Sequence, residues 1–100
     1  MSENQTRIVI TGLGQISAFG NTIDQLSVAL DTQQSGVRTL EQIPYEHLLA
    51  SYGGEAWGFT GNIDNYGPLE KTTMRAIKKG SRLMCREIQM GVASAQHALN

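Results

Sequence analysis

The chain opens with a short apolar run that predicts a strand. Residues 8–10 (IVI) are consecutive and β-branched, which suits a strand buried on both faces. The TGLG stretch at 11–14 then interrupts the run, because glycine allows positive φ or a close approach to other backbone. We therefore predict a strand over about residues 7–11, followed by a glycine-rich turn to residue 21.

A helix is predicted next, over about residues 22–33. Asn21 and Thr22 offer side-chain oxygens for capping, and Gln25, three residues after Thr22, completes a capping box. The apolar positions of this segment follow helical spacing, at Ile23, Leu26 and Leu30. Ser35-Gly36 ends the helix.

The middle of the chain has a weaker pattern. Residues 37–53 are predicted to be irregular, with one short helical turn at Tyr45–Leu49 after Pro44. Residues 55–61 alternate loosely and predict a weak strand. The following segment, 62–68, is rich in Asn, Gly and Pro and predicts a turn-rich connector.

From Leu69 the pattern is helical almost to the end, with a break near Gly80-Ser81. The final helix has small residues on several faces, so neighbouring elements can approach it closely: Gly91, Ala93, Ser94, Ala95 and Ala98. Its larger apolar positions step by three or four and share one face: Met84, Ile88, Val92, Ala95 and Leu99.

Composition sets the broad class. One hundred residues, 40% of them hydrophobic, fit one small globular unit or part of a larger one. The apolar runs are too short to span a bilayer, and the start has no signal-peptide apolar region, so a soluble, cytoplasmic protein without membrane association is predicted. The single cysteine excludes an internal disulfide framework.

Charge is distributed unevenly. Residues 1–70 hold two basic and eight acidic side chains, whereas residues 71–100 hold six basic and one acidic. All six basic residues fall between Lys71 and Arg86, with no carboxylate among them. Such an asymmetry is typical of a surface that meets an acidic partner. The pI near 6.0 and the lack of interleaved aromatics argue against nucleic acid as that partner.

Several motifs together resemble one family. Residues 7–21 (RIVITGLGQISAFGN) are similar to the opening R-x-V-I-T-G-x-G-x-x-S-P-x-G-N of the elongating β-ketoacyl-(acyl carrier protein) synthases, with Ala18 at the usual proline. The QSGV loop at 34–37 and the GE pair at 54–55 also have counterparts. The MCREIQMGVASA stretch at 84–95 resembles M-D-R-F-x-Q-Y-A-L-A-A-A, with Cys85 at the usual aspartate. The blocks occur in the family's order.

The resemblance implies an α/β chain that forms the N-terminal fragment of a thiolase-like layered fold. Residues 1–100 would be the first quarter of a ketosynthase domain, mostly helical with one or two strands when taken alone, and cut inside a longer sequence. Residues 1–6 are expected to be disordered. The first strand would pair with strands beyond residue 100, and the intact enzymes are usually homodimers.

The implied activity is a decarboxylative Claisen condensation of acyl- and malonyl-carrier thioesters, in fatty acid or polyketide synthesis. The family uses a cysteine nucleophile and two histidines, and those motifs do not occur within residues 1–100. Cys85 lies in another block, and on one helix it would stand roughly 18 Å from His97. We therefore predict no catalytic residue, and no activity, in this chain alone.

No cofactor or metal site is predicted. His47 and His97 have no partners at metal-ligand spacing. The Gly12-x-Gly14-x-x-Ser17 turn lacks the third glycine of a dinucleotide fingerprint. A cluster of aromatic residues in the middle of the chain favours packing under a loop over contact with substrate: Tyr45, Tyr52, Trp57, Phe59 and Tyr66.

The resemblance also implies a partner. Family enzymes receive the acidic acyl carrier protein on a basic surface, whose positions transfer here to Lys79 and Arg82, with Arg75 and Lys78 nearby. An ordinary solvated helix face is the alternative. Two other functions stay open: a ketosynthase-like subunit without a nucleophile, such as a chain-length factor that pairs with an active synthase, and a small stand-alone binding module.

Overall fold

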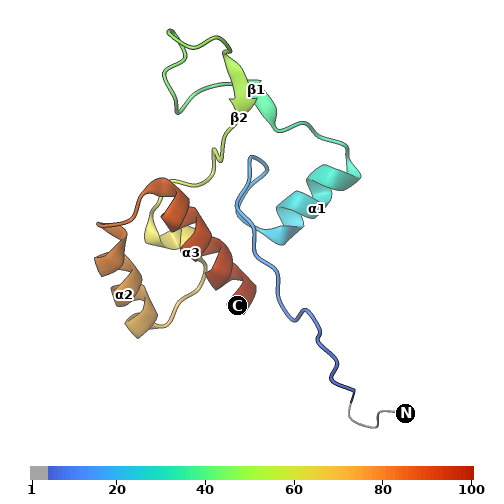
Figure 1. The fold of residues 1–100 in the computed structure, drawn as a ribbon, viewed down its shortest axis with the longest axis vertical. Coiled ribbons are helices and arrows are strands. Elements are labelled where there is room, and N and C mark those ends of the chain that lie inside the picture. The colour runs from blue at the N-terminus through green and yellow to red at the C-terminus, as the bar shows by residue number, and fades with distance from the viewer. Residues whose placement is uncertain (1–4) are drawn as a thin grey trace.

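The computed structural model describes residues 5–100 and shows a short hairpin and three helices (Figure 1). The elements are α1 (Ile23–Asp31), β1 (Val37–Thr39), β2 (Tyr52–Gly54), the 3-10 helix η1 (Ile63–Tyr66), α2 (Lys71–Ser81) and α3 (Arg86–Leu99). The prediction of a mixed α/β, mostly helical chain is confirmed. Of the segment expected to be disordered, residues 1–4 lie outside the described residues, and residues 5 and 6 form no helix or strand.

Both predicted strands are wrong in position. Residues 7–11 form no strand, and the side chains of Ile8, Val9 and Ile10 are 93%, 70% and 82% exposed. A strand requires a hydrogen-bonded neighbour, and no backbone hydrogen bond joins this segment to another one among the described residues. In Figure 1 the segment extends away from the rest of the molecule (blue).

The observed sheet is instead an antiparallel hairpin of β1 and β2, with Val37 opposite Gly54 and Thr39 opposite Tyr52. It occupies the ends of the segment predicted to be irregular. The connection between them contains a single turn closed by Leu48 N–H donating to the Tyr45 carbonyl at 3.0 Å, where a helical turn was predicted. The predicted strand at 55–61 is a turn instead.

The capping box of α1 is confirmed. The Thr22 hydroxyl accepts from the Gln25 N–H at 3.2 Å, and the Gln25 Oε1 accepts from the backbone N–H groups of Asn21 and Thr22 at 2.9 and 3.2 Å. These bonds satisfy donors that the first turn of a helix leaves free. The predicted apolar stripe is only partly covered, because Leu30 is 66% exposed.

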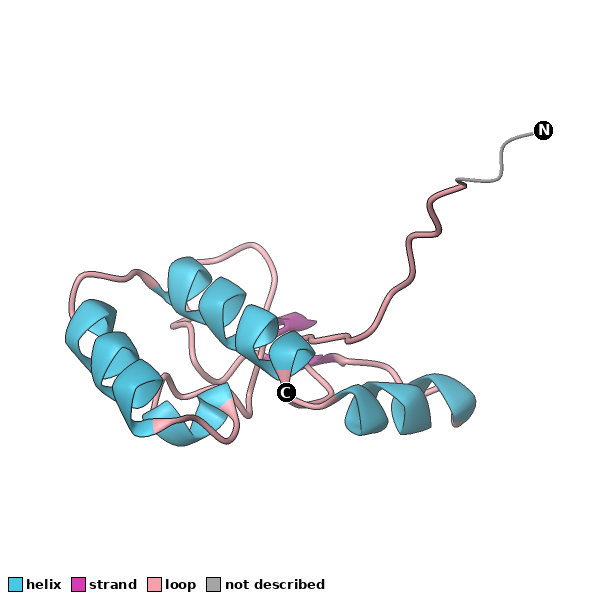
Figure 2. Ribbon diagram, turned by 90° about the horizontal axis from the view of Figure 1, so that it is seen from below, coloured by secondary structure: helices cyan, strands magenta, loops and turns pink. Residues whose placement is uncertain are grey.

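The core lies in the second half of the chain, where η1, α2 and α3 pack together. Its buried members are Phe59, Tyr66, Ile77 and Ala93. The predicted break near Gly80-Ser81 is confirmed, since α2 ends at Ser81 and α3 begins at Arg86. In Figures 1 and 2, α3 lies between α2 and α1.

The face of α3 that enters the core matches the predicted one only in part. Val92 of the predicted stripe packs against the core cluster, as Met90 does, and Ala93 belongs to that cluster. The other stripe residues Ile88, Ala95 and Leu99 are exposed. The reason is the small side chain of Ala93, which lets η1 approach the helix closely. Periodicity alone weights large side chains and therefore included Ile88 and Leu99, which are exposed.

Gly12 and Gly14 bring the N-terminal segment against α3. A Cβ atom on Gly12 would overlap the Ala98 carbonyl oxygen, and one on Gly14 would overlap the Ser94 carbonyl oxygen. Ser94 and Ala98 are one turn apart, so two successive turns of α3 meet two glycines of the segment. The close approach predicted from the glycines and from the small residues of the last helix is confirmed here.

Tyr66 carries a buried hydroxyl that has no hydrogen-bond partner among the described residues. The centroid of its ring lies 6.3 Å from that of the Phe59 ring. Burial raises the pKa of the Tyr66 hydroxyl. We expect Tyr66→Phe to leave stability unchanged or raise it by about 1 kcal/mol, because an unpaired buried hydroxyl costs about 1–3 kcal/mol. Urea unfolding measures this, with the exposed Tyr52→Phe as a control. A loss above about 1 kcal/mol would contradict the assignment.

Within residues 5–100, no helix combines the length and the hydropathy that crossing a bilayer requires.

Candidate functional site

The basic residues of α2, together with its C-cap Arg82, form one continuous face. Their positions are four, three, one and three residues apart, which places them within an arc of roughly 100° on a helix. All are exposed, while Ile77 on the other side of the helix is buried in the core. This face, called here the basic face, consists of Lys71, Arg75, Lys78, Lys79 and Arg82.

The structure therefore brings the four predicted docking residues together: Arg75, Lys78, Lys79 and Arg82. None of the cations of the basic face forms an ion pair with a carboxylate in the described part of the chain. Lys78 and Lys79 lie in the last turn of α2, where the carbonyl ends of the helix favour positive charge. The face is thus an exposed cationic surface whose charge is not neutralised within the described residues.

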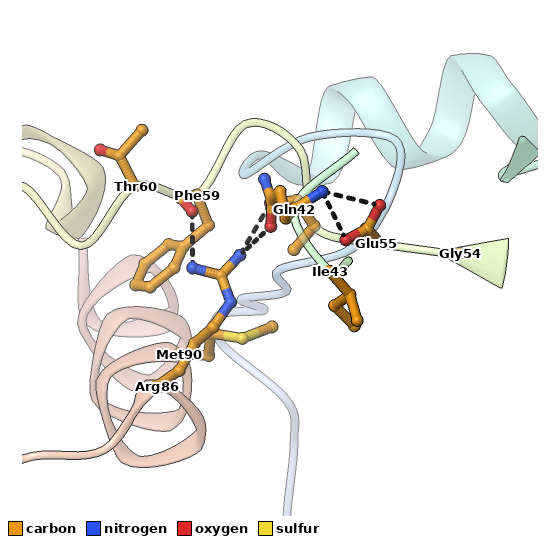
Figure 3. A pocket seen from close by; sticks show the side chains of 9 residues that line it. Gln42, Ile43, Gly54, Glu55, Phe59, Thr60, Arg86 and Met90 are labelled. Atoms are coloured by element: carbon orange, nitrogen blue, oxygen red, sulfur yellow. Dashed lines mark hydrogen bonds between the residues drawn. The ribbon is translucent and has the colours of Figure 1, made fainter. Parts of the chain in front are cut away.

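The sixth basic residue, Arg86, has a different environment. It is the first residue of α3, and its guanidinium points toward the loop that follows β2 (Figure 3). Nη1 donates to the Phe59 carbonyl at 2.9 Å, and Nη2 donates to the Ala56 carbonyl and to the Gln42 Oε1, each at 3.0 Å. Charge alone grouped Arg86 with the basic run, but its exposed side chain is hydrogen-bonded to oxygens of its own chain.

Glu55 completes this network from the hairpin side. The carboxylate is only 8% exposed and accepts from the backbone N–H groups of Glu41, at 2.7 Å, and Gln42, at 3.0 and 3.3 Å. Gln42 therefore bonds to Glu55 through its backbone and to Arg86 through its side chain. The network ties the loop after β1 to the start of α3.

These residues surround an open pocket of about 570 Å³ whose apolar wall includes Ile43, Phe59 and Met90. Figure 3 shows the guanidinium and the carboxylate directed at protein atoms on its rim. Because Arg86 and Glu55 are already hydrogen-bonded within the chain, the pocket presents a structural joint and not a set of free recognition groups. Sequence reasoning missed this role, although the block that contains Arg86 was part of the resemblance.

Removing the hydrogen bonds of the Arg86 guanidinium should destabilise the chain. We expect Arg86→Lys to lower the free energy of unfolding by about 2–4 kcal/mol, because one ammonium cannot reach three oxygens that a planar guanidinium serves, and bonds to charged groups contribute about 1.5–3 kcal/mol each. The control is Arg82→Lys on the exposed face, which should change stability by less than about 0.5 kcal/mol. Urea unfolding followed by Trp57 fluorescence distinguishes them. Equal stability of the two variants would contradict a structural role.

Cys85 and His97 do not form a catalytic pair. Cys85 is the N-cap of α3, is exposed, and its thiol lies 3.3 Å from the Glu87 Oε2. It makes no side-chain capping bond, in agreement with the predicted loss of a helix cap. His97, in the last turn of the same helix, places Nε2 2.9 Å from the Asn65 carbonyl and so holds η1 against α3. His47 lies in the exposed hairpin loop.

The aromatic residues divide into two groups. Phe59 and Tyr66 pack in the core, which confirms the packing interpretation for these two. Tyr45 and Tyr52 are exposed, and Trp57 lies under the Arg38 guanidinium at 3.5 Å. No group of three or more His, Cys, Asp and Glu residues gathers as a metal-binding cluster among residues 5–100.

Sequence comparison finds similarity to 3-oxoacyl-[acyl-carrier-protein] synthases. The chain is 30% identical over 96 residues to 3-oxoacyl-[acyl-carrier-protein] synthase 2 of Vibrio cholerae, an alignment that covers 96% of the chain and 20% of that protein. It is similar to a segment of these synthases. The corresponding protein of Vibrio harveyi is 29% identical over 97 residues, which is 97% of the chain and 21% of that protein.

A plant protein gives the same result over a shorter stretch. The chloroplastic 3-oxoacyl-[acyl-carrier-protein] synthase I of Arabidopsis thaliana is 32% identical over 65 residues, which is 63% of the chain and 14% of that protein. The chain thus spans about a fifth of the length of the two Vibrio proteins. No family model and no solved structure matches it.

Proposed function

We propose that the chain is the N-terminal part of a ketosynthase domain, and that the complete domain carries out the decarboxylative Claisen condensation of acyl- and malonyl-carrier thioesters. The similarity to 3-oxoacyl-[acyl-carrier-protein] synthases, which extends over 96% of the chain, supports the family relationship. In this proposal residues 1–100 supply scaffold and a docking surface for the carrier protein, and the nucleophile lies elsewhere in the domain.

The observation that carries the docking proposal is the basic face. Five exposed cations on one side of α2, without carboxylate partners among the described residues, create a positive potential suited to an acidic protein. Attraction of this kind acts mainly on encounter and orientation. Because each exposed ion pair contributes only about 0–1 kcal/mol, several must act together to give useful affinity.

A binding titration of the chain with an acyl carrier protein tests this proposal. We expect binding at about 0.1 M salt that weakens strongly toward 1 M, since the screening length falls from about 10 Å to about 3 Å. Lys79→Gln with Arg82→Gln should weaken binding. A matched control, Ser27→Glu with Gln34→Glu, changes net charge by the same amount on and just after α1 and should bind nearly as the parent does. Equal loss in both would show that only net charge matters.

The 100-residue chain should have no condensing activity of its own. Cys85 lies at the N-terminal end of α3 with its thiol beside Glu87, and His97 lies in the last turn of the same helix. No thiolate–imidazole pair forms between them. Incubation with acyl-carrier and malonyl-carrier substrates, followed by mass spectrometry, should detect no 3-oxoacyl product. Product above the rate of a Cys85→Ser variant would contradict this expectation.

A ketosynthase-like subunit without a nucleophile is the second candidate. Two departures from the family pattern permit it: Ala18 at the usual proline and Cys85 at the usual aspartate. Such a subunit would pair with an active synthase, whereas an active enzyme would form a homodimer. The residue at the nucleophile position of the complete protein distinguishes them, because only cysteine accepts the acyl group as a thioester.

A further inference from the structure

Leu83 is an exposed apolar side chain at the end of the basic face. It is 91% exposed and directly follows Arg82, the C-cap of α2. Between residues 71 and 84 it is the one large hydrophobic side chain that is exposed, since Met74, Ile77 and Met84 are at least partly buried. A single exposed leucine is common on protein surfaces, so its significance rests on the cations beside it.

The backbone places Leu83 beside these cations. Arg82 has helical φ and ψ of −62° and −25°, and the Leu83 N–H donates to the Gly80 carbonyl at 3.0 Å. The chain therefore continues its turn through residue 83. Leu83 follows Lys79 by four residues, a spacing that brings side chains together on one side of a helix. Leu83 is thus an apolar edge of the basic face.

Charge alone would give this surface fast encounter but only a short-lived complex. Exposed cations act mainly on association and orientation. The lifetime of a complex depends mainly on side chains that become fully desolvated at the contact, and changes at such positions alter the dissociation rate. Leu83 has most of its apolar surface still to bury, and it lies where the cations would bring an acidic partner.

We propose that Leu83 is the apolar anchor of the basic face, buried on docking against an apolar side chain that the carrier protein presents beside its carboxylates. This role rests on the proposed docking function, and it adds that the partner surface must be amphipathic and not merely acidic. Five exposed cations without carboxylate partners in the described part of the chain make an acidic protein the complementary partner.

Dissociation kinetics in a complete protein that contains this segment separate the apolar contact from charge. We expect Leu83→Ser to raise the dissociation rate of an acyl carrier protein about tenfold, at low and at high salt, with the association rate nearly unchanged. Leu83→Met keeps the apolar surface and should behave as the parent does. By contrast, Lys79→Gln with Arg82→Gln should slow association, and this effect should shrink as salt is added.

Leu49→Ser is the matched control. It removes another fully exposed leucine, in the hairpin loop, which Figure 1 shows well away from α2. This variant should leave both rate constants unchanged. Polyglutamate serves as a probe that offers carboxylates without an apolar side chain, and the parent and Leu83→Ser proteins should bind it equally. An equal loss with polyglutamate and with the carrier would show that Leu83 acts through the charges, and would overturn its role as an anchor.

The outcomes distinguish this role from the docking function on which it rests. If the charge variant weakens binding but Leu83→Ser leaves dissociation unchanged, the basic face docks the carrier and Leu83 is no anchor. If urea unfolding of the complete protein shows a larger loss for Leu83→Ser than for Leu49→Ser, other parts of the domain cover Leu83, which also overturns the proposal. A parent protein that binds no carrier would refute both the docking function and the anchor.

Discussion

Replacing Gly14 by alanine should lower the free energy of unfolding by about 1–3 kcal/mol, the range for forcing extra atoms into a packed contact. The added Cβ would overlap the Ser94 carbonyl oxygen, which belongs to helix backbone and cannot move aside as a flexible side chain can. Either α3 shifts or the N-terminal segment separates from it. Gly12→Ala should act in the same way through the Ala98 carbonyl.

Gly91→Ala is the matched control for this prediction. Gly91 lies on α3, and a Cβ atom there meets nothing within 4 Å. Because alanine is the better helix former by about 0.8–1.0 kcal/mol, this variant should be more stable than the parent chain. Urea unfolding should therefore show a lower free energy of unfolding for Gly14→Ala and Gly12→Ala, and a higher one for Gly91→Ala. A stable Gly14→Ala chain would show that the contact between the segment and α3 is not maintained in solution.

Charge reversal on the basic face should have the largest effect on carrier binding. Lys79→Glu with Arg82→Glu replaces two attractions by two repulsions, and we expect affinity to fall by about 10- to 100-fold, which is about 1.4–2.8 kcal/mol. Most of the loss should appear in the association rate, since exposed charges steer the encounter. Stopped-flow measurements across a salt series resolve this, because the difference from the parent should shrink toward 1 M salt.

The fold of the variant provides the control for charge reversal. Both side chains are exposed and form no ion pair among the described residues, so urea unfolding should be nearly unchanged. A variant that lost stability together with binding would point to a structural role for these residues. A loss of affinity that persisted at high salt would indicate contacts other than charge.

Local signals in the sequence predicted the local structure well. Thr22 and Gln25 form the predicted capping box, and the helical pattern after Leu69 gives α2 and α3 with the break in the expected place. These features depend on residues within a few positions of one another. The common face of Arg75, Lys78, Lys79 and Arg82 also follows directly from helical spacing.

Non-local pairing explains the failures. Residues 7–11 have strand propensity, but a strand forms only beside another strand. Propensity contains no information on where that neighbour is. The strands that do form are three residues long, and β2 contains Gly53 and Gly54, so no alternation marked them. Arg86 looked like the other cations because its three oxygen partners are 27 to 44 residues away along the chain.

Acyl loading of the complete protein tests the central claim most directly. A protein that contains this segment would be compared with its Lys79→Glu/Arg82→Glu variant on two substrates: an acyl group on the carrier protein, and the same acyl group on a small thioester without the carrier. We predict a 10- to 100-fold loss, about 1.4–2.8 kcal/mol, with the carrier-bound substrate and a nearly unchanged rate with the small thioester. An equal loss with both substrates would contradict carrier docking on the basic face.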